Sequence, residues 1–150
     1  MERNMNKSTA ILKWLLLAGA VYFLAVAIVH MLRIKIPMLF IYYDLPSYGY
    51  QDRIISFLSF GWSVFLFMAS IDPARNRDAV KAILIAGFAA IAGLNIINSV
   101  TDFQALSRDN NPSVFRKEVL ALSVYEAALI FFYFLAKRGK IKRGRTSDFN

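Results

Sequence analysis

Four long apolar stretches constrain the fold of this 150-residue chain more than any other feature. A helix needs about 20 residues, with a range of about 17–25, to cross the hydrocarbon core of a bilayer. The stretches have about this length and cover approximately residues 11–32, 54–71, 79–100 and 119–136. Because each is continuous and lacks the alternation of barrel strands, the sequence predicts an all-α integral membrane protein with a bundle of four transmembrane helices. We expect residues 1–150 to form this single membrane domain.

The composition agrees with a membrane protein and excludes several other classes. Hydrophobic residues make up 57% of the chain and charged residues 19%, whereas a soluble domain has about 45–50% and about 25%. The absence of cysteine excludes disulfides, thiolate metal sites and cysteine nucleophiles. The single histidine, His30, excludes a site with two histidine ligands. Because no phosphate-binding, serine-hydrolase or zinc-protease motif is present, we expect no metal, no nucleic-acid partner and no cofactor other than a bound lipid or quinone.

Positively charged residues predict the orientation of the helices, because they favour the cytoplasmic side of short loops. With both termini on one side, that side carries twelve Lys and Arg residues and the other side carries six. We therefore expect both termini inside the cell. Half of the inner charges lie in the basic segment 137–150, and these are Lys137, Arg138, Lys140, Lys142, Arg143 and Arg145. We expect them to contact anionic lipid headgroups.

The connections between the stretches differ in length. The inner connection, residues 72–78, is short and predicts an antiparallel hairpin in which Pro73 ends one helix and Asp78 caps the next. The first outer connection, residues 33–53, is rich in aromatic residues: Phe40, Tyr42, Tyr43, Tyr48 and Tyr50. Because aromatic rings favour the headgroup level, we expect this segment to lie on the outer surface as an aromatic lid.

Small residues predict which helix faces pack together, because helices associate in lipid through close approach and hydrogen bonds. They recur at helical spacing in the second and third stretches, as Ser56, Ser59 and Ser63, and as Ala86, Ala90 and Gly93. We expect both sets to face the interior of the bundle. For the serines, a hydrophilic conduit is the alternative.

Polar side chains gather in the outer halves of the predicted helices. Glu126 is the only acidic residue deep within a stretch, and it must be paired, hydrogen-bonded or protonated because an ionised group is costly in hydrocarbon. At about 1.5 Å per residue, it lies about 10 Å below the outer boundary. Further candidate ligand- or proton-binding residues, at smaller depths, are His30, Arg53, Asn95, Asn98 and Asp102. Together with Glu126 they predict an asymmetric polar pocket in the outer half of the bundle.

Each candidate also has a structural interpretation. Glu126 can be a structural carboxyl bonded to its neighbours instead of a site for a proton or a cationic ligand. His30 and Arg53 can be interfacial side chains, although Arg53 can also be the counter-ion of Glu126. The two asparagines can hydrogen-bond one helix to another.

Short motifs around the second and third stretches are Asp52-Arg53, Gly61-Trp62, Asp72-Pro73 with Arg77, and Val80-Lys81-Ala82. In these motifs, in size and in helix number, the chain resembles the small four-helix bacterial membrane proteins of the DoxX-like group. The resemblance implies a compact left-handed bundle and a quinone-, redox- or partner-associated role. It also places the protein in a bacterial inner membrane. Small multidrug exporters with four helices differ, because their essential carboxyl lies in the first helix and Glu126 lies in the fourth.

The sequence leaves three functions open. Because the chain shows no complete catalytic set, the first is an accessory or structural subunit of a larger membrane complex, with lipids and other membrane subunits or further copies of itself as partners. The alternative is a small transporter or a binder of a lipophilic ligand, such as a lipid or a quinone, that uses Glu126, Asn95 and Asn98. A membrane enzyme acting on a lipid or quinone is the third, and it requires His30, Arg53 and Glu126 to lie within about 10 Å of one another.

Overall fold

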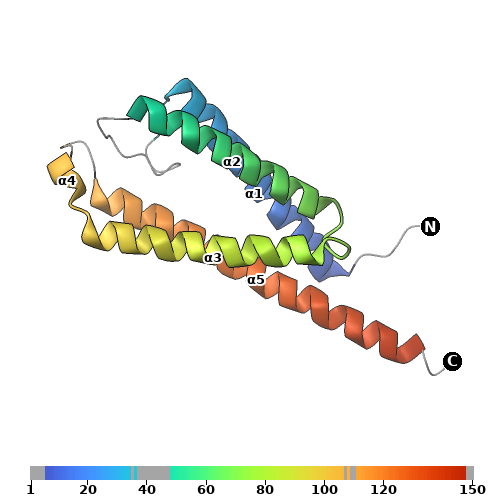
Figure 1. Ribbon diagram of the computed structural model, residues 1–150. Helices are drawn as coiled ribbons and strands as arrows, with labels where there is room; N and C mark the ends of the chain where they lie inside the picture. The colour runs from blue at the N-terminus through green and yellow to red at the C-terminus, as the bar shows by residue number, and fades with distance from the viewer. Residues whose placement is uncertain (1–5, 35, 37–47, 107, 109–110, 148–150) are drawn as a thin grey trace.

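The computed structural model of the chain describes residues 6–34, 36, 48–106, 108 and 111–147, and the side chains of these residues apart from 48 and 139–147. In this part of the chain every regular element is a helix (Figure 1). The elements are α1 (Lys7–Leu32), α2 (Tyr48–Ile71), α3 (Arg77–Val100), α4 (Phe103–Leu106) and α5 (Pro112–Ser147).

Four of these helices, α1, α2, α3 and α5, are long and apolar enough to cross a membrane. Each contains one of the four predicted stretches, so the predicted all-α bundle of four transmembrane helices is confirmed. The protein is a multi-pass membrane protein. The orientation with both termini inside remains a prediction.

All four spanning helices begin before the stretches predicted for them, and α2 and α5 extend the furthest. α2 begins at Tyr48 rather than near residue 54, and it therefore includes the last part of the expected aromatic lid. Phe40, Tyr42 and Tyr43 lie outside the described residues, so the lid itself remains a prediction. α5 begins at Pro112, where the Asn111 side chain caps the helix by accepting a hydrogen bond from the backbone N–H of residue 113 at 3.0 Å. The same helix runs to Ser147 and includes most of the basic segment.

The turn between α2 and α3 is built by the Asp72 carboxyl, which accepts hydrogen bonds from the backbone N–H groups of Ala74 and Arg75 at 3.0 and 3.1 Å. The chain therefore reverses early, and α3 begins at Arg77 with Asn76 in the cap position. The prediction that Asp78 caps α3 is wrong, because this residue lies inside the first turn. A negative charge in that position is still favourable next to the positive end of the helix dipole.

The four spanning helices form two antiparallel pairs, α1 with α2 and α3 with α5. Figure 1 shows that the two pairs approach each other near the α2–α3 turn and diverge toward α4. We call these the turn end and the loop end of the bundle. The pairs also contact each other, since α1 packs on α5 and α2 packs on α3.

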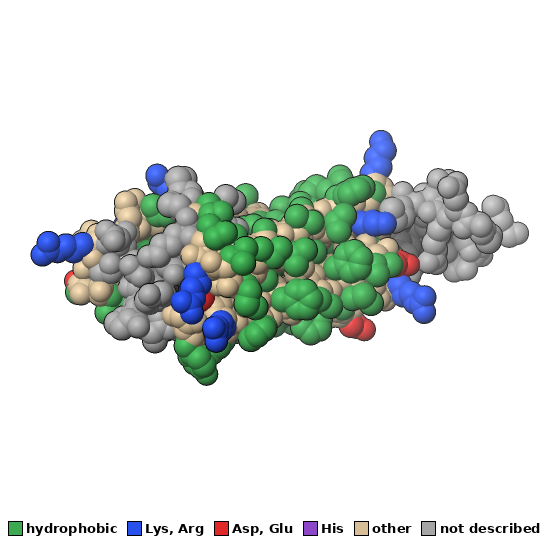
Figure 2. Space-filling model, turned by 90° about the horizontal axis from the view of Figure 1, so that it is seen from above, with side chains coloured by type: hydrophobic (Ala, Val, Ile, Leu, Met, Phe, Trp, Pro, Cys, Tyr) green, Lys and Arg blue, Asp and Glu red, His purple; other side chains and the backbone are tan. Residues whose placement is uncertain are grey.

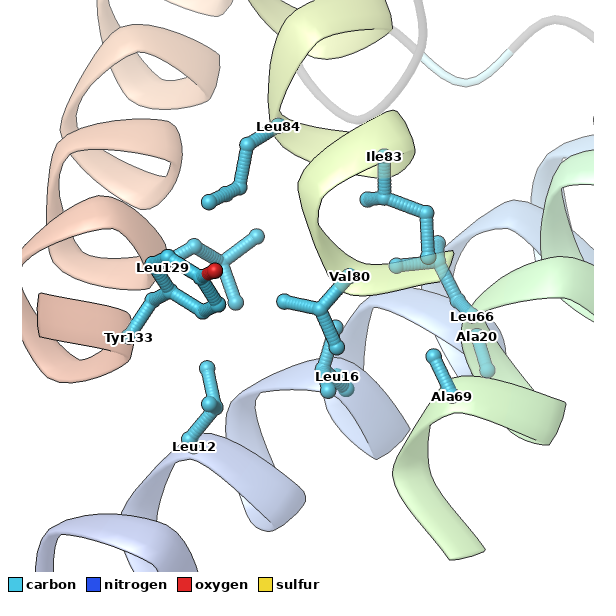
Figure 3. Packing of buried hydrophobic residues seen from close by; sticks show 10 residues of the cluster. All are labelled: Leu12, Leu16, Ala20, Leu66, Ala69, Val80, Ile83, Leu84, Leu129 and Tyr133. Atoms are coloured by element: carbon cyan, nitrogen blue, oxygen red, sulfur yellow. The ribbon is translucent and has the colours of Figure 1, made fainter. Parts of the chain in front are cut away.

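The hydrophobic core lies toward the turn end and receives side chains from all four spanning helices (Figure 3). Its members are Leu12, Leu16, Ala20, Leu66, Ala69, Val80, Ile83, Leu84, Leu129 and Tyr133. These side chains point toward one another in the close-up view.

The outside of the bundle is apolar along its middle. Figure 2 shows hydrophobic side chains over the middle of one face and Lys and Arg side chains toward its two ends. Large apolar residues of the spanning helices, such as Trp14, Phe57, Phe65 and Phe88, are exposed. This distribution fits a surface that contacts lipid tails in the middle and headgroups at the ends.

Candidate ligand-binding cavity

The face of α2 that packs on α1 carries a polar stripe. Asp52, Ser56, Ser59 and Ser63 follow one another at helical spacing, and all four are buried. The Ser63 hydroxyl donates to the backbone carbonyl of Ala20 in α1 at 2.8 Å. The Ser56 hydroxyl donates to the carbonyl of residue 53 within its own helix, also at 2.8 Å. Both hydroxyls therefore have backbone partners, and the bond of Ser63 joins the two helices.

His30 and Asp52 form a buried contact between α1 and α2 near the loop end. The distance between His30 Nδ1 and Asp52 Oδ1 is 2.9 Å, and the two side chains are 3% and 4% exposed. His30 is held in place by the end of α1, because Arg33 takes a left-handed conformation with φ of 55° and its N–H group donates to the His30 carbonyl. The His30 ring therefore gives Asp52 a nitrogen partner inside the bundle.

Glu126 of α5 lies inside the bundle, directly against the backbone of α3. The side chain is 6% exposed. A Cβ atom built on Gly87 would be 2.7 Å from Glu126 Oε2 and 3.0 Å from its Cδ, so the carboxyl occupies space that only a glycine leaves open. Glu126 Oε1 is buried and has no hydrogen-bond partner among the residues that the structure describes.

A cavity of about 230 Å³ lies between the core and the loop end, and all four spanning helices line it. We call it the central cavity. Its polar or partly polar lining side chains are His30, Glu126, Tyr22, Tyr125 and Trp62. The remaining lining residues are Phe23, Val26, Ile55, Leu66, Ile83, Gly87, Ala90, Ile91, Leu94, Leu122 and Leu129. Ligand sites commonly have this character, with a mostly apolar wall and a few polar groups.

A second cavity, of about 370 Å³, lies in the groove between α1 and α5. We call it the side cavity. It shares four lining residues with the central cavity, which are Tyr22, Phe23, Leu122 and Tyr125. Its one acidic lining residue is Glu118, whose two carboxyl oxygens are buried without a hydrogen-bond partner in the described part of the chain. The two cavities are therefore neighbours, and each has a carboxyl in its wall.

Tyr125 stands in the wall that the two cavities share. Its hydroxyl donates to the backbone carbonyl of Leu15 in α1 at 2.9 Å. The ring can cross α1 so closely because Gly19 has no side chain, and a Cβ atom at that position would overlap the Tyr125 hydroxyl oxygen. Gly19 therefore sets the distance between α1 and α5 at this level.

The structure brings two of the six candidate polar residues to the central cavity, His30 and Glu126. Arg53 is exposed and does not line it. Asn95 is exposed, and its side-chain amide donates to the carbonyl of Ile91 in its own helix at 2.9 Å. The expected use of Arg53 together with His30 and Glu126 by a membrane enzyme therefore finds no support in this geometry.

The other two candidates lie elsewhere on the loop side. Asn98 is half-buried and is not part of the cavity lining. Asp102 is exposed and begins α4, where its carboxyl accepts from the backbone N–H groups of Gln104 and Ala105, both at 3.2 Å. Asp102 therefore caps a short helix.

The small residues of α3 do not form one packed face. Ala90 lines the central cavity, and Ala86 and Gly93 are half-buried. A Cβ atom on Gly93 would meet no atom within 4 Å. Of the six basic residues expected at the headgroups, Lys137 and Arg138 are exposed, and the side chains of the other four lie outside the described residues.

Sequence reasoning missed two buried acidic residues, Asp52 and Glu118. A signal existed for Asp52, because it continues the helical spacing of Ser56, Ser59 and Ser63 toward the loop end. A weaker signal existed for Glu118, which lies eight positions before Glu126 and so on a similar side of a helix. Both residues lie near the ends of the apolar stretches, where charged side chains are usually exposed to headgroups and water.

Comparisons with known proteins add no identification to this geometry. No family model, curated protein or solved structure matches the chain.

Proposed function

We propose that this protein binds a lipophilic ligand within the membrane, in the central cavity. The observation that carries the proposal is the cavity itself, about 230 Å³ lined by all four spanning helices, with the buried carboxyl of Glu126 in its wall. A mostly apolar wall selects a lipophilic molecule, and one or two polar groups orient it. Glu126 is the one acidic residue in this lining, and its Oε1 has no hydrogen-bond partner among the described residues.

Molecules that dissolve in a bilayer suit a mostly apolar wall between spanning helices, and a membrane lipid or a quinone is an example. The resemblance to the DoxX-like group supports a quinone, and it supports a bacterial inner membrane as the location. Binding without chemistry, or binding followed by transport, is consistent with the same cavity. We do not assign an enzymatic reaction to it.

The proposal is tested by filling the cavity. Ala90 lines the central cavity, whereas its neighbour Ala89 does not. Ala90→Trp should therefore expel a lipophilic molecule that copurifies with the protein, and Ala89→Trp should retain it. Both variants would be reconstituted into lipid nanodiscs, and the bound molecules would be extracted and identified by mass spectrometry. If both variants and the parent protein carry the same bound molecules in the same amounts, the cavity is not the binding site.

A second candidate function is that of an accessory subunit in a larger membrane complex. The observation that favours it concerns α3, which is the least buried of the four spanning helices. Gly93 leaves open space on this helix, and small residues allow another helix to approach closely in lipid. Purification in mild detergent should then yield a complex with other subunits or with further copies of the chain. A free monomer, together with chemical crosslinking that captures nothing, would contradict this function.

A further inference from the structure

Asp52, Glu118 and Glu126 are all buried on the loop side of the core, but their surroundings differ. Asp52 lies 2.9 Å from His30. Glu118 and Glu126 are 7% and 6% exposed, and three of their four carboxyl oxygens are buried with no hydrogen-bond partner among the described residues. Two carboxyls in the walls of neighbouring cavities therefore lack the partner that the third one has.

A buried carboxyl without a partner raises the free energy of the folded state, so a ligand that supplies a partner binds favourably there. The nearby Tyr125 hydroxyl does not fill this role, because it donates to the Leu15 carbonyl at 2.9 Å. The close contact with Gly87 places the Glu126 carboxyl against α3. This carboxyl is therefore positioned before any ligand arrives.

Aromatic side chains surround the same space. Tyr22, Phe23 and Tyr125 line both cavities, and Trp62 lines the central one. The rings of Phe23 and Trp62 are stacked, with centroids 6.0 Å apart and planes 24° apart. The faces of aromatic rings attract cations, most strongly where water is excluded.

The cavity wall is apolar and combines aromatic faces with a carboxyl that has no partner. Together these features favour a positively charged ligand with an apolar body. We infer that the central cavity receives an organic cation of this kind, with its charged group beside Glu126. This inference rests on the proposed function, because it names the ligand class of the same cavity.

An organic cation fits these surroundings better than a metal ion does. Metal ions such as Ca²⁺ and Mg²⁺ require several oxygen ligands at once. In the described part of the chain, no three side chains of the His, Cys, Asp and Glu types are grouped to hold a metal ion. An organic ammonium group needs a single carboxylate and can complete its surroundings with aromatic faces.

Two small molecules of nearly the same shape test the charge requirement. Benzyltrimethylammonium carries a positive charge, and neopentylbenzene replaces its nitrogen atom by carbon. Binding of each to the full chain in lipid nanodiscs at neutral pH would be measured by ligand-observed NMR titration, with empty nanodiscs subtracted. We expect the ammonium compound to bind about tenfold more tightly than the neutral one, a factor at the lower end of the coupling measured for close charge pairs at a protein interface.

Three variants locate the effect. Glu126→Gln should lower the affinity for the ammonium compound by about tenfold or more and leave that for neopentylbenzene nearly unchanged. Glu118→Gln should leave the ammonium affinity nearly unchanged, because Glu118 lines only the side cavity. Asp78→Asn is the matched control, because the Asp78 side chain is 95% exposed near the turn end, and it should change neither affinity.

The outcomes separate this inference from the proposed function. If both compounds bind equally and Glu126→Gln changes neither affinity, the charge requirement is wrong. In that case, loss of binding of both compounds in Ala90→Trp would still support a binding cavity. If neither compound binds, the inference about the cation fails, whereas a copurified molecule that Ala90→Trp expels would still support the proposed function.

Discussion

Gly87 of α3 and Glu126 of α5 lie so close together that position 87 has no room for a side chain. A Cβ atom there would be 2.7 Å from Glu126 Oε2 and 3.2 Å from Oε1. Both residues line the central cavity. The packing of α3 on α5 and the position of the buried carboxyl therefore depend on the same contact.

Gly87→Ala should destabilise the protein, because its methyl group must displace a buried carboxyl. Overpacking of this kind costs about 1–3 kcal/mol. Gly61→Ala is the matched control, since no atom lies within 4 Å of its Cβ position, and a helical alanine there should be neutral or slightly stabilising. Unfolding midpoints in detergent would compare the two variants. Equal midpoints would show that Glu126 can move away from Gly87 freely.

His30→Ala should destabilise the contact between α1 and α2, because it leaves Asp52 buried without its nitrogen partner. A buried polar group that loses a hydrogen-bond partner typically costs about 1–3 kcal/mol. Replacing both residues, as His30→Leu with Asp52→Leu, should recover part of the loss, because the buried carboxyl is removed together with the imidazole ring. A double-mutant cycle on unfolding measures this coupling. Additive effects of the two single changes would contradict it.

Gly19→Ala should push α1 away from α5, because the added methyl group overlaps the Tyr125 hydroxyl oxygen. Tyr125→Phe alone removes a hydrogen bond to Leu15 and should cost about 1 kcal/mol. In the double variant, the removal of the hydroxyl oxygen makes space for the methyl group, so the two losses should be less than additive. Midpoints of the single and double variants test this rescue. A fully additive loss would mean that the strain comes from other atoms.

The absence of cysteine makes the predicted orientation easy to test with single-cysteine variants. Arg75→Cys lies in the turn between α2 and α3, and Arg108→Cys lies between α4 and α5. Both arginines are exposed. With both termini inside, a membrane-impermeant thiol reagent added to intact cells should label position 108 and spare position 75. Labelling of position 75 and not of position 108 would show that both termini lie outside.

The polar pocket shows where prediction from the sequence reached its limit. The rise per residue placed Glu126 and His30 together in the outer half of the predicted bundle. Both residues line the central cavity. The same argument placed Asn95 near them, yet this side chain is exposed and bonded to its own helix. Its neighbour Leu94 lines the cavity instead. A rotation of about 100° separates consecutive helical residues, and depth along the helix gives no information about that rotation.

The amino-acid sequence by itself determined that the chain forms four membrane-spanning helices and which polar residues each of them carries. This follows from the length and hydrophobicity that a bilayer demands of any helix that crosses it. The tertiary structure alone decided which faces meet, and so turned Asp52 and Glu118 inward and Arg53 and Asn95 outward. The physical reason is that lipid tails are as apolar as a leucine core, so hydrophobicity does not distinguish the inner face of a spanning helix from the outer one. Close contacts such as those of Gly19 with Tyr125 and Gly87 with Glu126 make that distinction instead.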